Sequence, residues 1–237
     1  MFEASTFEDI PYLSYIPRPV FPNISEKHIK RFRQLDVMLA AGNKIENFID
    51  AYVDIVLLNT VRKSDENAYE RARLAVDYAL KVRIVGKKHL IKFNQLLVGH
   101  NEDTFRQQPV WLGASHPAYA WFVGSPANKL DNLVEQLLKA PNQKIPLSLI
   151  SLISLFRLLS IHPFADGNGR TTRLYVIQLI HRTFGSNMIY LKLLEALWDR
   201  PQFYMHAVSL AIRDREDWSE LFEYCFATIE IKCKLYT

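Results

Sequence analysis

The sequence predicts an all-α fold interrupted by one β-hairpin. Most of the 237 residues lie in segments whose apolar side chains recur every three to four positions, which is typical of amphipathic helices. One stretch differs: "FRQQPVWLGASHPAYAWFVG" joins strand-forming residues across a Gly/Ser/Pro turn, and this pattern indicates a hairpin. The nearly continuous apolar run "PLSLISLISLFRLLSI", from Pro146, predicts a central core helix buried on most of its sides.

Four helices are expected before the hairpin. Ser25 can cap the first, which runs to Gly42 and carries one apolar stripe: Ile29, Phe32, Leu35 and Leu39. The second lies in "IENFIDAYVDIVLL", the third in "ENAYERARLAVDYALKV", and the fourth covers about 87–98. The preceding segment is rich in proline and aromatic residues, which favours an extended arm.

After the hairpin, Ser125 and Pro126 are expected to cap and open a helix with an apolar stripe from Leu130 to Leu138. The core helix follows, and "GRTTRLYVIQLIHRTFG" predicts an amphipathic helix closed by Gly185. Two or three further helices, one opening at Pro201, complete the chain. The expected organisation is an extended arm (1–24), an N-terminal helical region (25–86) and a helical core with the hairpin and C-terminal helices (87–237).

The amino-acid composition limits which partners and which cellular compartment are expected. Hydrophobic residues make up 49% of the chain and the net charge is +4, without a long basic block, so nucleic acid is not an expected partner. The apolar run is shorter than the roughly 18–20 residues of a membrane span and contains Arg157, so no membrane partner is expected. Cys225 and Cys233 would lie ~12 Å apart on a helix, too far for a disulfide. Two free thiols and no signal pattern predict a cytoplasmic protein.

The stretch "HPFADGNGRTTR" carries the candidate chemistry. His162 follows the most buried helix and has a side chain suited to proton transfer. Asp166 is a hard oxygen ligand fit for Mg²⁺. Residues 167–169 (Gly-Asn-Gly) can gather backbone N–H groups at a helix N-terminus, where anions bind. Arg170 and Arg173 lie one turn apart and can each fork to a phosphate. Together these residues indicate phosphate-transfer machinery.

Each of these features taken alone also has a structural explanation: a histidine at a helix end, a polar turn, a solvated arginine pair. Their concentration within one turn favours a built anion site. The stretch does not match the P-loop pattern G-x-x-x-x-G-K-[ST], and it lacks a second His or Cys for a metal-hydrolase site.

The same stretch matches H-x-F-x-[DE]-G-N-G-R-x-x-R at every specified position, and the chain therefore resembles the Fic (filamentation, Fic/Doc) family. The similarity extends from about Val56 to Ala227 and includes the hairpin and "RPQFYMHAVSLAIRDREDWSELFEYCF". The resemblance implies a Fic-type helical core with one β-hairpin flap. It also implies Mg²⁺-dependent transfer of AMP from ATP to a hydroxyl (Ser, Thr or Tyr) of a target protein, with release of pyrophosphate.

The resemblance also implies a role for each motif residue. His162 would deprotonate the target hydroxyl, Phe164 would anchor the loop, and Asp166 would hold Mg²⁺ on the α- and β-phosphates. The phosphate-binding set would be Gly167, Asn168, Gly169, Arg170 and Arg173, with Arg173 on the γ-phosphate. Doc-like phosphotransferases carry lysine at the position of Gly169, so glycine here favours nucleotidyl transfer.

The hairpin residues Trp111, Phe122 and Val123 would belong to the family's flap. An open strand edge can pair with an extended target segment, and the resemblance implies that role. The structural alternative, in which the hairpin covers the core, stays open.

Many Fic proteins carry an inhibitory helix with the pattern [ST]-x-x-x-E-[GN], whose glutamate pairs with the second motif arginine. The corresponding region here, "LLNTVRKSDENAYE", provides Glu66 and Asn67, but Arg62 stands where Ser or Thr belongs. Two interpretations therefore stay open: Glu66 as an inhibitory partner of Arg173, or as an ordinary acid at a helix end.

The preferred interpretation is a protein adenylyltransferase with ATP and a target protein as partners. Auto-inhibition, self-modification and homo-oligomerisation stay open. One alternative keeps the site but removes AMP from a modified protein or transfers another phosphate-linked group. Another is a non-catalytic nucleotide-binding or toxin–antitoxin module.

Overall fold

The structure, a computed structural model, describes residues 22–42, 44–58, 67–112, 120, 122–139, 145–199 and 218–234. These residues form a helical fold with one two-stranded antiparallel sheet, so the predicted all-α class with a single hairpin is confirmed. Within the same ranges no helix combines the length and the apolar character that a membrane crossing requires.

Among the described residues four helices precede the hairpin, as predicted: α1 (Glu26–Ala41), α2 (Phe48–Leu57), α3 (Ala68–Lys81) and α4 (Lys87–Val98). The predicted cap of α1 is confirmed, because the Ser25 hydroxyl accepts the backbone N–H of His28. Helix α1 buries His28, Phe32, Leu35 and Leu39, while Ile29 is partly buried against the core. Gly99, with φ of 84°, closes α4 in the left-handed region that glycine adopts without strain.

The hairpin pairs β1 (Trp111–Leu112) with β2 (Phe122–Val123), with Trp111 opposite Val123. The expected cap at Ser125 is wrong: Pro126 occupies the cap position of a short 3₁₀ turn, η3 (Ala127–Lys129), without a side-chain cap bond. Helix α5 (Leu130–Leu138) then continues from this turn. The fixed φ of proline opens the turn here without a hydroxyl cap.

The remaining described helices are α6 (Leu147–Ile161), α7 (Asn168–Phe184), α8 (Met188–Asp199) and α10 (Ser219–Lys234). The helix predicted to open at Pro201 lies outside the described residues. Cys225, on α10, is a buried free thiol.

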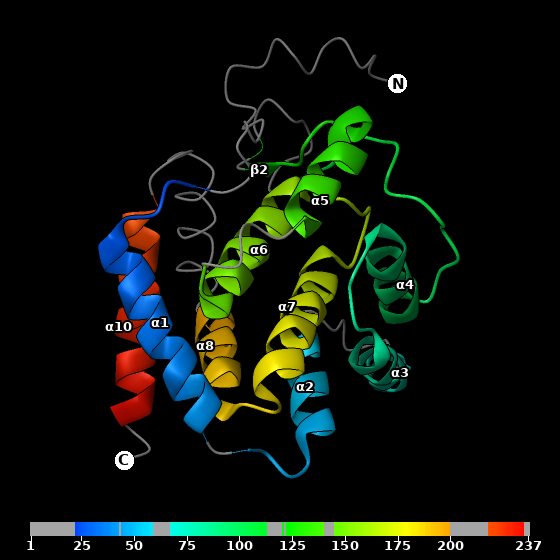
Figure 1. The fold of residues 1–237 in the computed structure, drawn as a ribbon. Helices are drawn as coiled ribbons and strands as arrows, with labels where there is room; N and C mark the ends of the chain where they lie inside the picture. The colour runs from blue at the N-terminus through cyan, green and yellow to red at the C-terminus, as the bar shows by residue number, and fades with distance from the viewer. Residues whose placement is uncertain are drawn as a thin grey trace.

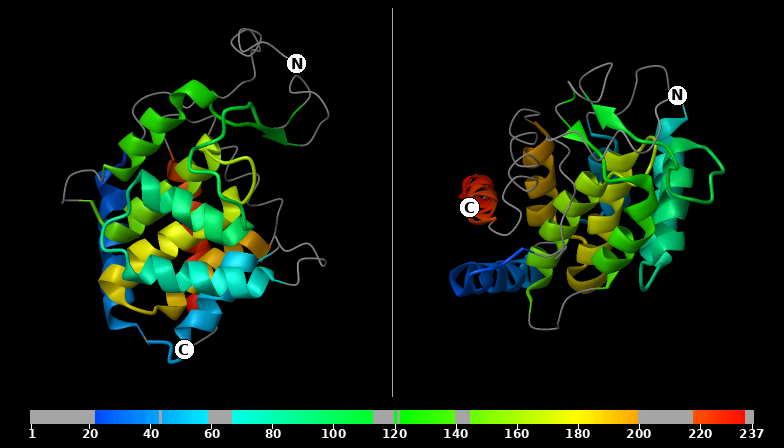
Figure 2. Two further views of the ribbon diagram at one scale, coloured as in Figure 1. Left: turned by 90° about the vertical axis from the view of Figure 1, so that its right-hand side faces the viewer. Right: turned by 90° about the horizontal axis from the view of Figure 1, so that it is seen from above.

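Helices α6 and α7 run side by side through the middle of the molecule (Figure 1). Helix α6 is buried along nearly its whole length, as its composition predicts, and it packs against α1 and α5. Helix α7 contacts α2, α3, α4 and α8, so the core has two central helices rather than one. Figure 2 shows α3 and α4 lying side by side against α7. The short loop between α6 and α7, residues 162–167, therefore joins the two central helices of the core.

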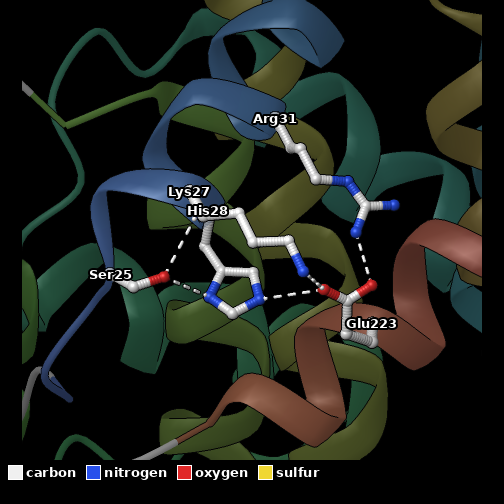
Figure 3. A network of polar contacts seen from close by, with 5 residues as sticks. All are labelled: Ser25, Lys27, His28, Arg31 and Glu223. Atoms are coloured by element: carbon white, nitrogen blue, oxygen red, sulfur yellow. Dashed lines mark hydrogen bonds and ion pairs between the residues drawn. The ribbon is translucent and has the colours of Figure 1, made fainter.

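Helices α1 and α10, far apart in sequence, are joined by a polar network centred on Glu223 (Figure 3). Its carboxylate accepts from Lys27 Nζ at 3.0 Å, from Arg31 Nη1 and from His28 Nε2 at 3.3 Å. The other ring nitrogen of His28 lies 2.8 Å from the Ser25 hydroxyl. Hydrogen bonds from Arg31 and Lys27 lower the pKa of Glu223 to about 2, so the carboxylate stays charged over the whole physiological range.

Candidate functional site

His162 is the residue at which α6 ends, and its backbone is left-handed, with φ of 53° and ψ of 60°. Its N–H still donates to the Leu158 carbonyl at 3.0 Å, as in a C-terminal cap. The left-handed conformation costs a non-glycine residue about 1–2 kcal/mol. The surrounding contacts must therefore hold His162 in place.

The protonation state of His162 follows from its contacts. Nδ1 lies 3.2 Å from the Leu159 carbonyl, which can only accept, so the proton of the neutral ring resides on Nδ1 and Nε2 keeps its lone pair. Burial lowers the pKa of His162 to about 4; the charge of Arg106 acts in the same direction, while the Leu159 carbonyl and Asp166 oppose it. The imidazole is therefore neutral at pH 7, with Nε2 able to accept a proton.

The loop after His162 is closed by the side chain of Asn168. Its Oδ1 accepts the N–H of Phe164 at 2.9 Å, and its Nδ2 donates to the carbonyl of Phe164 at 2.7 Å. Phe164 is buried with its ring against Phe105, so its predicted anchoring role is confirmed. The side-chain amide of Asn168 is thus occupied by the loop backbone. Asn168 could therefore contact a bound anion only through its backbone N–H.

Asp166 projects from this loop and its side chain is 74% exposed. One oxygen accepts the N–H of Gly167 at 2.6 Å, and the other pairs with Arg170 Nη2 at 3.2 Å. Mg²⁺ is commonly held by one or two carboxylates together with substrate phosphates. A single accessible carboxylate beside a helix N-terminus is a donor set that fits such an ion.

Both motif arginines are buried on α7, but they point to different neighbours. Arg170 Nη1 donates to the Leu97 carbonyl at 3.0 Å, at the end of α4. Arg173 is fully buried, and its Nε and Nη2 donate to the Val56 carbonyl at 3.2 and 2.7 Å. Because Val56 lies in the last turn of α2, the guanidinium complements the negative end of that helix dipole. The structure thus brings Arg170 to Asp166, and directs Arg173 toward α2.

Sequence reasoning missed two residues that hold the loop. Asn94, buried on α4, donates to the Asp166 carbonyl at 2.9 Å and to the Thr171 hydroxyl at 3.0 Å, and it accepts from His100 Nε2 at 2.9 Å. An asparagine on the apolar stripe of α4 is the signal that could have revealed it. Arg106 donates to the His162 carbonyl at 2.7 Å, and no periodicity marks it.

The hairpin forms one wall of the site. Phe122 is buried with its ring 5.2 Å from that of His162, centroid to centroid, and Val123 is also buried. Trp111 is partly buried, whereas Leu112 is exposed. The predicted docking of a target along the strand edge stays a prediction. Glu66 lies outside the described residues.

This fold and site define a helical domain whose candidate active site is the loop between its two central helices. The family model described as the Fic/DOC family matches residues 85–180, which include α4, the hairpin, α5, α6 and most of α7. Residues 85–180 therefore correspond to the Fic/DOC family. No curated protein sequence matches the chain.

Solved structures of Fic proteins share the fold. A Fic family protein from Desulfovibrio desulfuricans superposes with a TM-score of 0.56 at 17% identity, covering 86% of this chain and 62% of its own. Fic-1 from C. elegans gives 0.55 at 15% identity, covering 89% of this chain and 72% of its own. An IbpAFic2 variant in complex with adenylylated Cdc42 gives 0.53 at 19% identity, covering 78% and 62%. The chain thus spans 62% of the length of the first and the third.

Proposed function

We propose that the chain is a protein adenylyltransferase, which transfers AMP from ATP to a hydroxyl of a target protein with the help of Mg²⁺. The observation that carries the proposal is the neutral His162, whose Nε2 keeps its lone pair and whose loop, residues 162–167, leads directly into the N-terminus of α7. The Fic/DOC match supports it, as does the related fold of IbpAFic2, which has been seen with an adenylylated protein.

In the proposed reaction the target hydroxyl oxygen bonds to the α-phosphorus of ATP. Its proton passes to Nε2 of His162, and the bond between the α-phosphorus and the bridging oxygen breaks, so that pyrophosphate leaves. The Leu159 carbonyl holds Nδ1–H and thereby keeps Nε2 as the accepting atom. Because burial keeps the ring neutral, no prior loss of a proton is needed at pH 7.

The phosphates would lie at the start of α7. The N–H groups of a first helical turn lack intrahelical acceptors, and the helix dipole makes this end positive. Asn168, Gly169 and Arg170 provide that turn, and the Arg170 guanidinium adds a charge. Asp166 would hold Mg²⁺, which when bound neutralises charge on the phosphates. Arg173 would reach the γ-phosphate only if its guanidinium left the Val56 carbonyl, to which it donates in this structure.

The proposal is tested by incubating the purified chain and a cell extract with Mg²⁺ and ATP carrying a radiolabel at either the α- or the γ-phosphate. Adenylylation predicts labelled protein from the α-labelled nucleotide alone. Label from the γ-position would instead indicate phosphate transfer, and no label from either would favour a binding module. Release of AMP from a pre-modified protein would instead indicate hydrolytic removal of AMP.

Asp166→Ala is expected to weaken the Mg²⁺ dependence of ATP binding, because the phosphates alone hold the ion poorly in a solvated site. The measurement is ATP affinity by calorimetry at increasing Mg²⁺. Asp131→Ala is the matched control, since Asp131 is also an exposed, ion-paired carboxylate, but on α5. Identical Mg²⁺ curves for Asp166→Ala and the wild type would remove Asp166 from the site.

We further propose that Glu66 restrains the enzyme by pairing with Arg173. The support is the attachment of Arg173 to Val56, in the last turn of the helix that precedes the segment 59–66. A carboxylate there would compete with the γ-phosphate for the guanidinium, a hydrogen bond worth about 1.5–3 kcal/mol. The nucleotide would then bind in an unreactive position.

Glu66→Gly is accordingly expected to raise self-labelling by α-labelled ATP, and the double variant with His162→Ala is expected to stay inactive. Glu70→Gly is the control, because it places a similar glycine at an exposed position in the first turn of α3. Unchanged or lower labelling in Glu66→Gly would refute the restraint and leave Glu66 as an ordinary acid at a helix end.

A further inference from the structure

Arg106 is a buried arginine that joins three segments of the chain. Its Nε donates to the His162 carbonyl at 2.7 Å, its Nη1 to the Gln108 carbonyl at 2.7 Å, and its Nη2 to the Ser125 carbonyl. Its backbone N–H donates to the Pro163 carbonyl at 2.9 Å. One residue therefore holds the turn after α6 and the chain on either side of the hairpin.

The contacts at the turn bear directly on the candidate base. His162 has a left-handed backbone, and the direction of its carbonyl is fixed by that conformation. Arg106 binds this carbonyl and the next one, so it opposes a return of the turn to an ordinary backbone. The position of the imidazole ring depends on its own backbone, and the guanidinium thus sets where Nε2 lies.

The contacts at the hairpin place the flap against the same point. Gln108 precedes β1 and Ser125 follows β2, so the two carbonyls bracket the hairpin base. Gly124 donates to the Val110 carbonyl at 2.9 Å, and Ser125 donates to the Ile161 carbonyl at 3.2 Å. The Phe122 ring then rests on the His162 ring. Arg106 and Phe122 therefore connect the ends of the two strands to His162, the candidate base.

The chain leaves space for this arrangement only because residue 124 is glycine. A Cβ there would lie 2.8 Å from Arg106 Nη2, 2.9 Å from Val110 Cγ1 and 3.1 Å from His162 Cβ. An arginine bound to three carbonyls cannot move aside as a free side chain would. A methyl group at this position would press the guanidinium away from its acceptors while leaving its charge in place.

We propose that Arg106 is a positioning residue, which fixes His162 relative to the flap through its three carbonyl contacts. The guanidinium is suited to this because its donors form a rigid planar fork, whereas the ammonium of lysine is a compact point charge. The kinetic part rests on the adenylyltransferase function proposed above. The geometric part does not, because it concerns the backbone at 162–163 and 124–125.

The test compares Arg106→Lys with the wild type. The variant is expected to lower kcat for AMP transfer about 10–100-fold, the usual effect of a displaced reacting group, with the KM for ATP changed less than about threefold. Amide hydrogen exchange in peptides covering 122–125 and 162–164 is expected to quicken about tenfold or more. Arg182→Lys is the control, since Arg182 also donates to a carbonyl, that of Arg83, far from the loop.

A second variant, Gly124→Ala, covers the case in which Arg106→Lys does not fold. It is expected to reproduce the loss of kcat and the faster exchange at 162–164 with the arginine present.

The His162 resonance, assigned with His162→Ala, is expected to titrate at higher pH in Arg106→Gln, which removes the charge that disfavours the imidazolium.

Wild-type kcat together with wild-type exchange in a folded Arg106→Lys or Gly124→Ala would overturn the proposal. Equal losses of kcat and of ATP affinity, without faster local exchange, would overturn it too and leave Arg106 as a general packing residue. If the wild type transfers no AMP, the exchange still decides: faster exchange at 162–164 supports the positioning role, and unchanged exchange refutes it.

Discussion

His162→Ala is expected to lower AMP transfer about 10²–10⁴-fold, the range that a general base contributes. Nε2 is the atom that accepts the target proton in the proposed reaction, and alanine provides no acceptor. ATP affinity is expected to stay within about threefold of the wild type, because in the proposed site the phosphates would contact α7 rather than the ring. The measurements are single-turnover transfer and equilibrium binding of ATP. His89→Ala, at the start of α4, is the control histidine.

The pH dependence of AMP transfer is a second test of His162 as the base. A base with an ordinary histidine pKa of about 6.5 would lose activity through pH 6. The pKa of His162 is lowered to about 4, so transfer is expected to persist to about pH 5. The free energy of unfolding also depends on this pKa. The unfolded chain binds the proton more tightly than the folded chain, so His162 begins to destabilise the fold as pH falls below 6.5. Wild-type transfer in His162→Ala would refute the mechanism.

Gly167→Ala is expected to destabilise the protein and to disrupt the loop together. Gly167 has φ of 77°, and a Cβ there would lie 2.5 Å from Val98 Cγ2 and 2.7 Å from Asn94 Nδ2. A left-handed alanine costs about 1–2 kcal/mol, and overpacking against α4 adds about 1–3 kcal/mol. We therefore expect the free energy of unfolding in urea to fall by about 2–5 kcal/mol, and ATP binding to weaken.

Gly99→Ala separates the two costs. Gly99 is also left-handed, with φ of 84°, but its Cβ would meet the flexible side chain of Arg71, nearest at 3.2 Å. Only the backbone cost of about 1–2 kcal/mol is expected there. Equal destabilisation by Gly167→Ala and Gly99→Ala would show that close contact with α4 adds no cost at Gly167.

Local patterns in the sequence were sufficient for most of the fold. The apolar stripe of α1, the caps at Ser25 and Gly185 and the continuous apolar run of α6 each depend on neighbours within a few residues, and each is present in the structure. The cap at Ser125 failed because Pro126 opens a 3₁₀ turn instead. The motif residues His162 to Arg173 were found because they are contiguous.

What holds the site could not be found this way, because the partners are distant in sequence. Asn94 and Asp166 are separated by 72 residues, Arg106 and His162 by 56, and Arg173 and Val56 by 117. A pattern shows that an arginine is present but not which carbonyl it will reach. The direction of Arg173, into the core toward α2, follows from the packing of two helices and from no local signal.

The joining of α1 to α10 by Glu223 imposes an order on synthesis. Lys27, His28 and Arg31 precede Glu223 by 192–196 residues, and Phe32 of α1 packs on Phe222 and Phe226. A ribosome that adds about 5–20 residues per second needs roughly 10–40 s to cross that interval. Throughout it the apolar stripe of α1 lacks its α10 partners, whereas the candidate loop and its motif, which end at Arg173, are complete 50 residues before Glu223 is added. The nascent chain therefore contains its whole candidate site before α1 can pack against α10.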